Sequence, residues 1–244
     1  MSNLATEIWL GKLTRREFRQ RMASGQLNLA ILPVAATEQH LEHLAMEHDW
    51  RSARLIAGAV ASALSPQALV AETLMSGISE HHMNHPGTLS LQPGTFLMVL
   101  SDVIDSLKRA GFTNILVLNG HGGNIATCEA TWDQLLRKFR VNLHFLPYWN
   151  VLNQQDASDL LDSGDRLPED LPGHAQEFET SMALDAFPEN VRQSMWADQA
   201  DPTPAMATAD KGAAFTQRIV ERVTAYAGDM IEGRRANEAP PFHP

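Results

Sequence analysis

Short apolar runs alternate along this chain with longer segments in which apolar residues recur at helical spacing. The apolar runs are residues 27–36, 68–74, 114–118 and 141–146. Runs of this length that are rich in Leu, Ile and Val are typical of strands buried on both faces. The helical segments between them are residues 50–64, 95–110 and 123–139. The alternation predicts right-handed crossovers and a single-domain, three-layer α/β fold with a mainly parallel sheet flanked by helices.

The remainder of the chain adds three helices and three polar connections. The helices are predicted over residues 15–22, 176–184 and 211–231. The connections are residues 76–94, 156–172 and 188–209. The first is long enough to shape a site, and the second is irregular and acidic, a candidate lid or oligomer contact. No linker divides the chain, so we expect one domain over residues 1–232 and a flexible tail over residues 233–244.

Composition argues against several partners and compartments. The formal charge is 19 − 29 = −10, which disfavours binding to a nucleic-acid backbone. No apolar stretch approaches the ~20 residues of a membrane span, and residues 1–17 lack the apolar core of a signal peptide. Cys128 is the only cysteine and lies in a predicted helix, where it is expected to be a packing residue. We therefore expect a cytoplasmic protein without nucleic-acid or membrane partners.

Eight of the ten histidines fall in four short segments, together with several carboxylates. These segments are residues 37–49, 79–85, 119–124 and 173–180. Neutral imidazole and ionised carboxylate bind borderline divalent cations such as zinc and manganese. Because the histidines cluster beside glycines and at the ends of predicted strands, the pattern predicts a metal-assisted hydrolytic site.

Glu38 and His40 lie two residues apart just after the first predicted strand. In extended backbone this spacing puts both side chains on one face, within reach of one metal centre. Asp49 follows immediately before a predicted helix. It is either a further ligand or the N-cap of that helix, for which aspartate is a favoured residue.

His121 lies in the sequence Asn-Gly-His-Gly-Gly-Asn, directly after a predicted strand. Open α/β sheets bind their ligands at the carboxyl ends of such strands. Gly120, Gly122 and Gly123 allow the backbone to approach a metal or substrate closely. The following helix aims N–H groups at any oxyanion held there, so these glycines are candidate substrate contacts.

His174 precedes the helix that carries Glu177 and Glu179. Its side chain is the best candidate for a proton carrier, because the ordinary pKa of histidine lies near neutrality. Two positions apart on a helix, the glutamates point in different directions, and spacing alone does not say which faces the site. Trp149, after the fourth predicted strand, either stacks on a small planar substrate or packs in the core.

The remaining clustered histidines are His81, His82 and His85. Glycine and proline surround them, so a stable helix that would make His82 and His85 a ligand pair is not expected. They are interpreted as residues that line the site or pack the loop.

The ordered set of motifs resembles the creatininase (creatinine amidohydrolase) family. The matching pieces are residues 32–40, Asp49, residues 85–88, residues 119–124 and residues 174–181. The resemblance implies a compact α/β fold with a two-metal centre, most often zinc, with manganese or iron as alternatives. It also implies a homo-oligomer, commonly a hexamer, and a small-molecule substrate.

Residue by residue, the resemblance implies that Glu38 and His121 hold one metal, that His40 and Glu179 hold the other, and that Asp49 bridges both. Glu179 is preferred to Glu177 because Glu179-Thr180-Ser181 matches the family's Glu-Thr-Ser. Creatininase itself has a glutamate in the glycine loop, two residues after the loop histidine, where this chain has Gly123. This difference argues against creatinine as the substrate.

The predicted reaction is hydrolysis of a C–N amide bond, in a cyclic amide or a formamide, by a metal-bridging hydroxide with His174 as proton shuttle. Opening of a keto-inositol ring at a C–C bond is the main alternative, and cleavage of a peptide-derived redox cofactor precursor is another. A non-catalytic metal-binding protein on the same scaffold is the remaining hypothesis.

Overall fold

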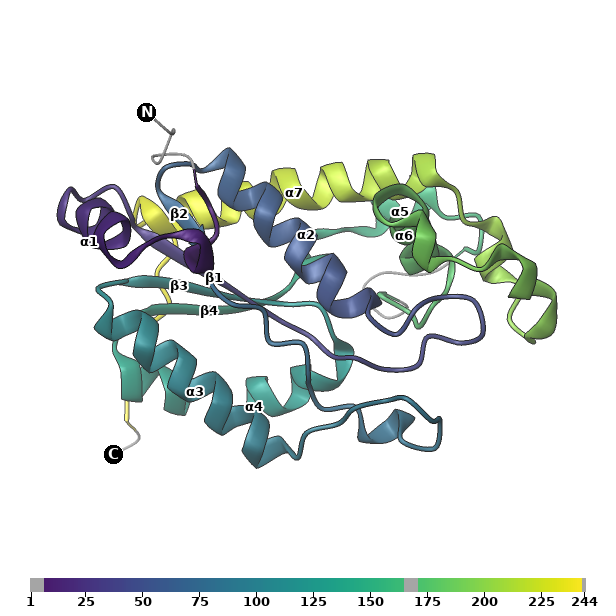
Figure 1. The fold of residues 1–244 in the computed structure, drawn as a ribbon, viewed down its shortest axis with the longest axis horizontal. Coiled ribbons are helices and arrows are strands. Elements are labelled where there is room, and N and C mark those ends of the chain that lie inside the picture. Colours follow the sequence, from purple (N-terminus) through teal and green to yellow (C-terminus); the bar gives the residue numbers. More distant parts are fainter. Residues whose placement is uncertain (1–6, 165–170, 243–244) are drawn as a thin grey trace.

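The computed structural model describes residues 7–164 and 171–242, which fold around a four-stranded parallel sheet (Figure 1). The strands are β1 (Leu29–Val34), β2 (Ala68–Val70), β3 (Asn114–Asn119) and β4 (Asn142–Pro147). Their order is β2-β1-β3-β4, and every pairing is parallel. Each connection between consecutive strands contains a helix, as parallel pairing requires.

Seven α-helices surround the sheet. They are α1 (Arg15–Ala23), α2 (His48–Ala63), α3 (Pro93–Arg109), α4 (Ile125–Phe139), α5 (Gln154–Leu160), α6 (Glu177–Ala186) and α7 (Ala209–Ile231) in the described ranges. Figure 1 shows α2 and α7 on one face of the sheet and α3 and α4 on the other. The predicted three-layer α/β architecture is therefore confirmed.

Successive side chains of β1 point to opposite faces of the sheet and contribute to the core on both faces. Leu29 and Ile31 pack in the cluster under α2 and α7, whereas Ala30 and Leu32 pack in the cluster under α3 and α4. All six residues of β1 are buried, which explains why the run is continuously apolar. The carboxyl end of this strand thus emerges from a packed centre and holds the residues that follow it in fixed positions.

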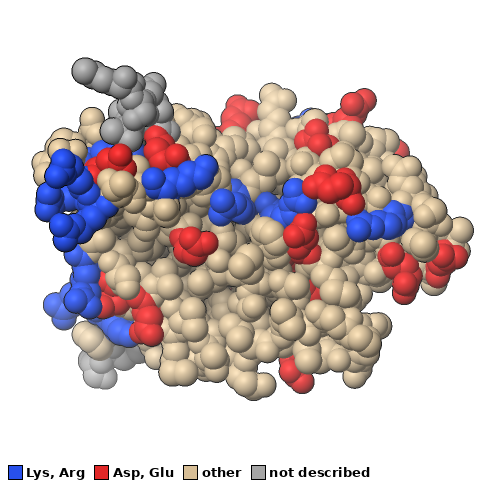
Figure 2. Space-filling view, in the orientation of Figure 1, with Lys and Arg blue, Asp and Glu red and all other residues tan. Residues whose placement is uncertain are grey.

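Cys128 is buried in the α4 layer, as the sequence predicts, and burial raises the pKa of its thiol to about 12. None of the helices in the described ranges has the length and apolarity that a membrane span requires. On the face drawn in Figure 2, Lys and Arg gather over the end that carries α1, and charges of both signs are interspersed elsewhere.

One expected irregular segment is more ordered than predicted. Residues 154–160 form α5, because Asn153 and Asp156 make a capping box and Asp156 pairs with Arg218 and Arg222. The partners that stabilise α5 lie on α7, too distant in sequence to be anticipated. Residues 165–170 of the predicted lid lie outside the described residues.

The predicted tail is described as far as residue 242. It runs against α4 and β4: Arg137 donates to Pro240 O, and Asn237 donates to Leu143 O. The two final residues lie outside the described part.

Candidate metal centre

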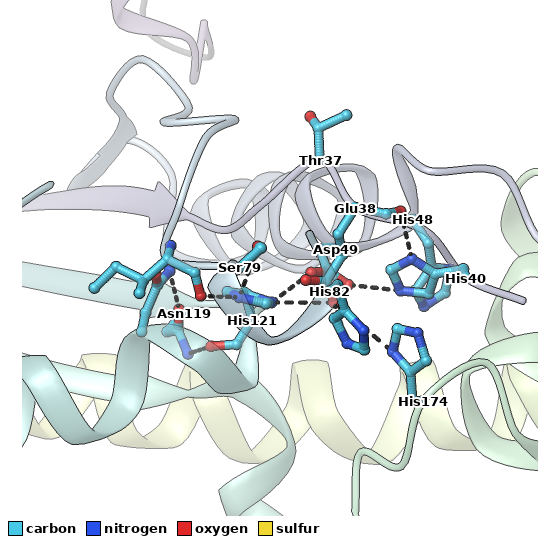
Figure 3. A network of polar contacts seen from close by, with 12 residues as sticks. Thr37, Glu38, His40, His48, Asp49, Ser79, His82, Asn119, His121 and His174 are labelled. Carbon is cyan, nitrogen blue, oxygen red and sulfur yellow. Dashed lines mark hydrogen bonds and ion pairs between the residues drawn. The ribbon is translucent and has the colours of Figure 1, made fainter. Parts of the chain in front are cut away.

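Segments from four parts of the chain bring the predicted ligands together at the carboxyl edge of the sheet, and Figure 3 shows four of these residues, Glu38, His40, Asp49 and His121. Glu38 and His40 follow β1, and His121 follows β3. Asp49 lies in the first turn of α2, and Glu179 lies in the first turn of α6. All five side chains are buried, with exposures of 1% to 3%. Side chains this polar are rarely buried together unless they hold one another or a cation.

Asp49 lies between two imidazoles at the centre of this cluster. His40 Nε2 is 3.0 Å from Asp49 Oδ1, and His121 Nδ1 is 2.9 Å from Asp49 Oδ2. Burial alone would raise the pKa of Asp49, but the charges of His40 and His121 hold it well below its usual value. Asp49 is not the N-cap of α2, since Glu47 occupies that position and makes no side-chain cap hydrogen bond.

The orientation of His121 is fixed by the strand that carries it and by a neighbouring segment. Its Nε2 lies 2.9 Å from Ile78 O and 3.2 Å from Ser79 Oγ. The carbonyl can only accept, so Nε2 carries the proton. Nδ1 is therefore the nitrogen free to bind a cation, and it lies 3.5 Å from Glu38 Oε1. Asn119 Nδ2 donates to His121 O and fixes the backbone. A backbone carbonyl holding the distal nitrogen is the usual arrangement around metal-binding histidines.

Glu179 and Glu177 have different environments, which resolves the choice left open by their spacing. Glu179 Oε2 lies 3.9 Å from His40 Nε2 and accepts a hydrogen bond of 2.6 Å from Ala175 N–H. Glu177 points to the other side of α6, where it pairs with Lys211 and accepts two backbone N–H groups that follow α5. Glu179 therefore faces the cluster, and Glu177 ties α6 to α7.

A matched pair of substitutions tests this assignment. Glu179→Gln is expected to lower metal content, because an amide is a poorer ligand than a carboxylate. Glu177→Gln is expected to leave metal content unchanged and to lower the free energy of unfolding by about 2 kcal/mol, through weaker charged hydrogen bonds. Metal analysis and urea denaturation of both variants measure the two effects. Metal loss from the Glu177 variant with none from the Glu179 variant would reverse the assignment.

Glu38 Oε2 is buried and makes no hydrogen bond among the described residues. His40 Nε2 and Asp49 Oδ2 make none either, and each is held by the ion pairs of Asp49 with His40 and His121. Three groups of potential ligand atoms lie within 4.8 Å of one another: Glu38, His40 and His174; Glu38, His81 and His121; and His40, Asp49 and Glu179. Buried carboxylates and imidazoles gathered in this way are costly without a cation. The residues present therefore fit a pair of divalent cations bound by nitrogen and oxygen ligands.

Metal affinity is expected to fall as the pH falls. In the metal-free protein burial lowers the pKa of His40, but the Asp49 carboxylate outweighs it and raises this pKa to about 10. The pKa of His121 is raised to about 8 by Asp49 against the effect of burial. Both imidazoles are thus protonated at pH 7, and a cation must displace their protons. Each proton displaced weakens binding by about tenfold per unit of pH decrease. Zinc titrations in competition with a chelator between pH 6 and 8 measure this slope, and a flat profile would contradict it.

His174 lies at the mouth of the cluster, held by Gln39. The Gln39 amide is oriented by Leu41 N–H, which donates to its Oε1 at 2.9 Å. Its Nε2 therefore donates to His174 Nε2 at 2.7 Å and to His82 Nδ1 at 2.8 Å. This places the proton of the neutral His174 ring on Nδ1, which lies 3.7 Å from Glu38 Oε1. Burial and the neighbouring charge of His40 lower the pKa of His174 to about 3, so the ring is neutral near pH 7.

A cavity of about 320 Å³ opens onto the cluster. It is lined by Glu38, Asp49, His81, His82, Gly120, His121, Gly122, Gly123, Pro172, Gly173, His174 and Glu179. The three glycines predicted as substrate contacts are therefore at the cavity wall. Trp149 is not: only 3% exposed, it packs edge-on against Tyr148 in the core beneath α7. Of the two roles that the sequence left open for Trp149, substrate stacking is therefore ruled out in favour of core packing.

Sequence reasoning assigned no role to two buried histidines beside the cluster. His48 lies 4.0 Å from Glu179 Oε1 through its Nε2, and burial lowers its pKa to about 3. His43 Nε2 lies 2.9 Å from Thr180 Oγ1. Both support the walls behind the ligands. The sequence feature that could have indicated a role for them is that both lie in the same histidine-rich segment as His40.

Comparison with known proteins identifies the family. Residues 11–218 match the Creatininase family, described as creatinine amidohydrolase. The creatinine amidohydrolase of Pseudomonas putida is 30% identical over 199 residues, covering 77% of this chain and 75% of that protein. The 3-dehydro-scyllo-inosose hydrolase of Thermotoga maritima is 30% identical over 201 residues, covering 81% of this chain and 61% of that protein.

Solved structures show the same fold. The Mn form of creatininase superimposes with a TM-score of 0.81 at 25% identity, covering 92% of this chain and 99% of that one. A creatininase variant complexed with creatine gives a TM-score of 0.80 at 25% identity, covering 91% and 98%. The family match spans most of the chain, the fold agrees and the predicted motifs meet at one site: this protein belongs to the creatininase family of metal-dependent hydrolases.

Proposed function

We propose that this protein is a two-metal hydrolase that cleaves a C–N amide bond, in a cyclic amide or a formamide, of a small molecule. The observation that carries the proposal is the position of Asp49, whose two carboxylate oxygens each face a different imidazole. A carboxylate placed in this way can bridge two cations. Glu38 and His121 would complete one site, and His40 and Glu179 the other. Zinc suits these ligands best, and manganese or iron are alternatives.

Cations in this centre would supply a water of lowered pKa and would polarise the substrate carbonyl. The protein's own groups supply orientation and proton transfer. His174 stands at the cavity mouth, where it can carry a proton. Its neutral ring would first take up the proton released by the attacking water and, as the imidazolium, would then give a proton to the departing nitrogen and return to the neutral form. Backbone N–H groups of the Gly120 to Gly123 loop stand at the cavity wall, where they can stabilise an oxyanion.

The cavity limits the substrate to a small molecule or to the end of a larger one. A carbon–carbon ring opening of a keto-inositol is the second candidate, because the Thermotoga maritima inosose hydrolase matches 81% of this chain. Cleavage of a short precursor peptide is a third, since a mycofactocin precursor peptide peptidase of Mycolicibacterium smegmatis is 31% identical over 114 residues. We further propose a cytoplasmic homo-oligomer, a hexamer by analogy with the family.

A substrate panel distinguishes these functions. Small lactams, formamides, keto-inositols and short peptides are incubated with metal-loaded protein, and products are identified by mass spectrometry. We expect hydrolysis of a lactam or formamide that stops on chelation and returns when zinc or manganese is added. Turnover restricted to keto-inositols or to peptides would replace the proposal with one of the alternatives. Turnover that survives complete metal removal would refute the two-metal scheme.

A further inference from the structure

His81 is a cavity-lining histidine without an assigned partner. It lies in a short 3₁₀ turn, Glu80–His82, inside the long connection between β2 and α3. Its ring is exposed and lies parallel to that of His121, with centroids 5.9 Å apart and an interplanar angle of 16°. Its imidazole makes no hydrogen bond with another side chain or backbone group in the described ranges. Both ring nitrogens are therefore available.

The backbone that carries His81 is tied to the loop that carries His121. Ile78 N–H donates to Asn124 Oδ1 at 3.0 Å, and Ile78 O accepts from His121 Nε2 at 2.9 Å. One residue further on, Ser79 N–H donates to Ser90 Oγ at 2.9 Å. Ser79 and His121 appear side by side in Figure 3. The position of His81 relative to His121 is thus fixed by a short hydrogen-bonded frame.

Gly123 leaves room for this arrangement. A Cβ atom at Gly123 would lie 2.0 Å from Ile78 O and 2.9 Å from His81 Cε1. Any side chain at position 123 would therefore collide with the turn. The space beside His121 that a side chain of the glycine loop would fill is occupied instead by the turn that carries His81.

We propose that His81 is a third protein ligand, beside Glu38 and His121, of the cation bound at that half of the centre. The proposal rests on the two-metal site proposed above. The ligand atoms of the three residues lie within 4.8 Å of one another. Two ligands about 2.1 Å from one tetrahedral cation lie about 3.4 Å apart. An exposed ring closes the remaining distance, at most about 1.4 Å, by a side-chain rotation.

His82, the neighbouring histidine, is held by contacts of its own, and its Nε2 lies 3.7 Å from Glu38 Oε1. Its Nδ1 accepts from Gln39, and its ring stacks on His174 with centroids 4.2 Å apart. The two adjacent histidines thus have different neighbours. The His81 ring stacks on His121, and the His82 ring stacks on His174, the proposed proton carrier. With His81 bound, this cation would have two imidazoles together with the carboxylates of Glu38 and Asp49.

Zinc binding to the metal-free protein tests the proposal without any substrate. His81→Ala is expected to weaken one of the two zinc sites by about 100-fold and to leave the other unchanged, in competition titrations with a chelator. His85→Ala is the matched control, since His85 is an exposed histidine of the same connection and does not line the cavity. Glu38→Gln is the positive control for the affected site. Unfolding temperatures of the metal-free variants should match that of the wild type.

Cadmium substitution gives a direct second readout. In protein with ¹⁵N-labelled histidine and bound ¹¹³Cd, one cadmium should couple to two imidazoles, and His81→Ala should remove one of these couplings. If His81→Ala binds zinc like the wild type while Glu38→Gln weakens one site, His81 is not a ligand and the two-metal centre stands. If Glu38→Gln and Asp49→Asn also leave zinc binding unchanged, the centre itself is refuted, and His81 with it.

Discussion

Asp49→Asn should reduce turnover by at least about 10³-fold and should lower the bound metal from two cations per chain. The carboxylate lies 3.0 Å from His40 Nε2 and 2.9 Å from His121 Nδ1, and it is the one group that both halves of the centre share. An asparagine keeps the shape but removes the charge that bridges the cations. The loss of several kcal/mol of charge stabilisation corresponds to this fall in rate. Metal analysis and turnover of the best substrate measure both effects.

The variant is expected to remain folded. Without the carboxylate, His40 releases its proton rather than stay as an uncompensated buried charge. Asp156→Asn is a suitable control, because Asp156 is an equally buried carboxylate whose partners are Arg218 and Arg222, away from the centre. That control should lose stability and keep both cations. Full turnover by folded Asp49→Asn protein would contradict the proposed centre.

His174→Ala is expected to lower kcat by about 10²- to 10⁴-fold with little change in metal content. The ring is at the cavity mouth, where it can take up the proton released by the attacking water and pass a proton to the departing nitrogen. Gln39 fixes the tautomer of the neutral ring, with its proton on Nδ1, so Gln39→Glu should reproduce part of the loss by offering His174 Nε2 an acceptor instead of a donor. Steady-state kinetics with matched metal loading separate kcat from KM.

An exposed histidine, His85, provides the control for the His174→Ala experiment. His85→Ala changes an exposed ring outside the cavity and should leave kcat unchanged. A His174→Ala enzyme with the wild-type kcat and its full metal content would show that protons reach the leaving group by another route. A parallel loss of metal would instead make His174 a ligand, which its proximity to Glu38 and His40 permits.

Much of the fold follows from local sequence pattern. The continuous apolar character of residues 29–34 reflects burial on both faces of a central strand, and it is visible without tertiary information. Helix α5 was missed because its stability depends on an ion pair between Asp156 and two arginines of α7, more than 60 residues away. Strand β2 ends at Val70, before the predicted end at residue 74, and Leu74 makes only an isolated parallel bridge with Val34.

The candidate site was likewise predictable from the sequence only in part. The ligands after β1 and β3 could be placed from sequence, because strand ends of a parallel sheet share one edge. Spacing alone could not separate Glu179 from Glu177, since the difference depends on Lys211 of α7, which pairs with Glu177 on the opposite side of α6. For Trp149, a position after a strand end could not decide between stacking on a substrate and core packing, and the packing beneath α7 turns it inward.

The metal content of the protein purified without chelator is the most direct test of the central claim. Elemental analysis against a quantified protein concentration should give two divalent cations per chain. Asp49→Asn protein prepared in parallel should give clearly less. A wild-type protein that holds no zinc, manganese or iron, and that takes up none when these ions are supplied at pH 8, would contradict the account.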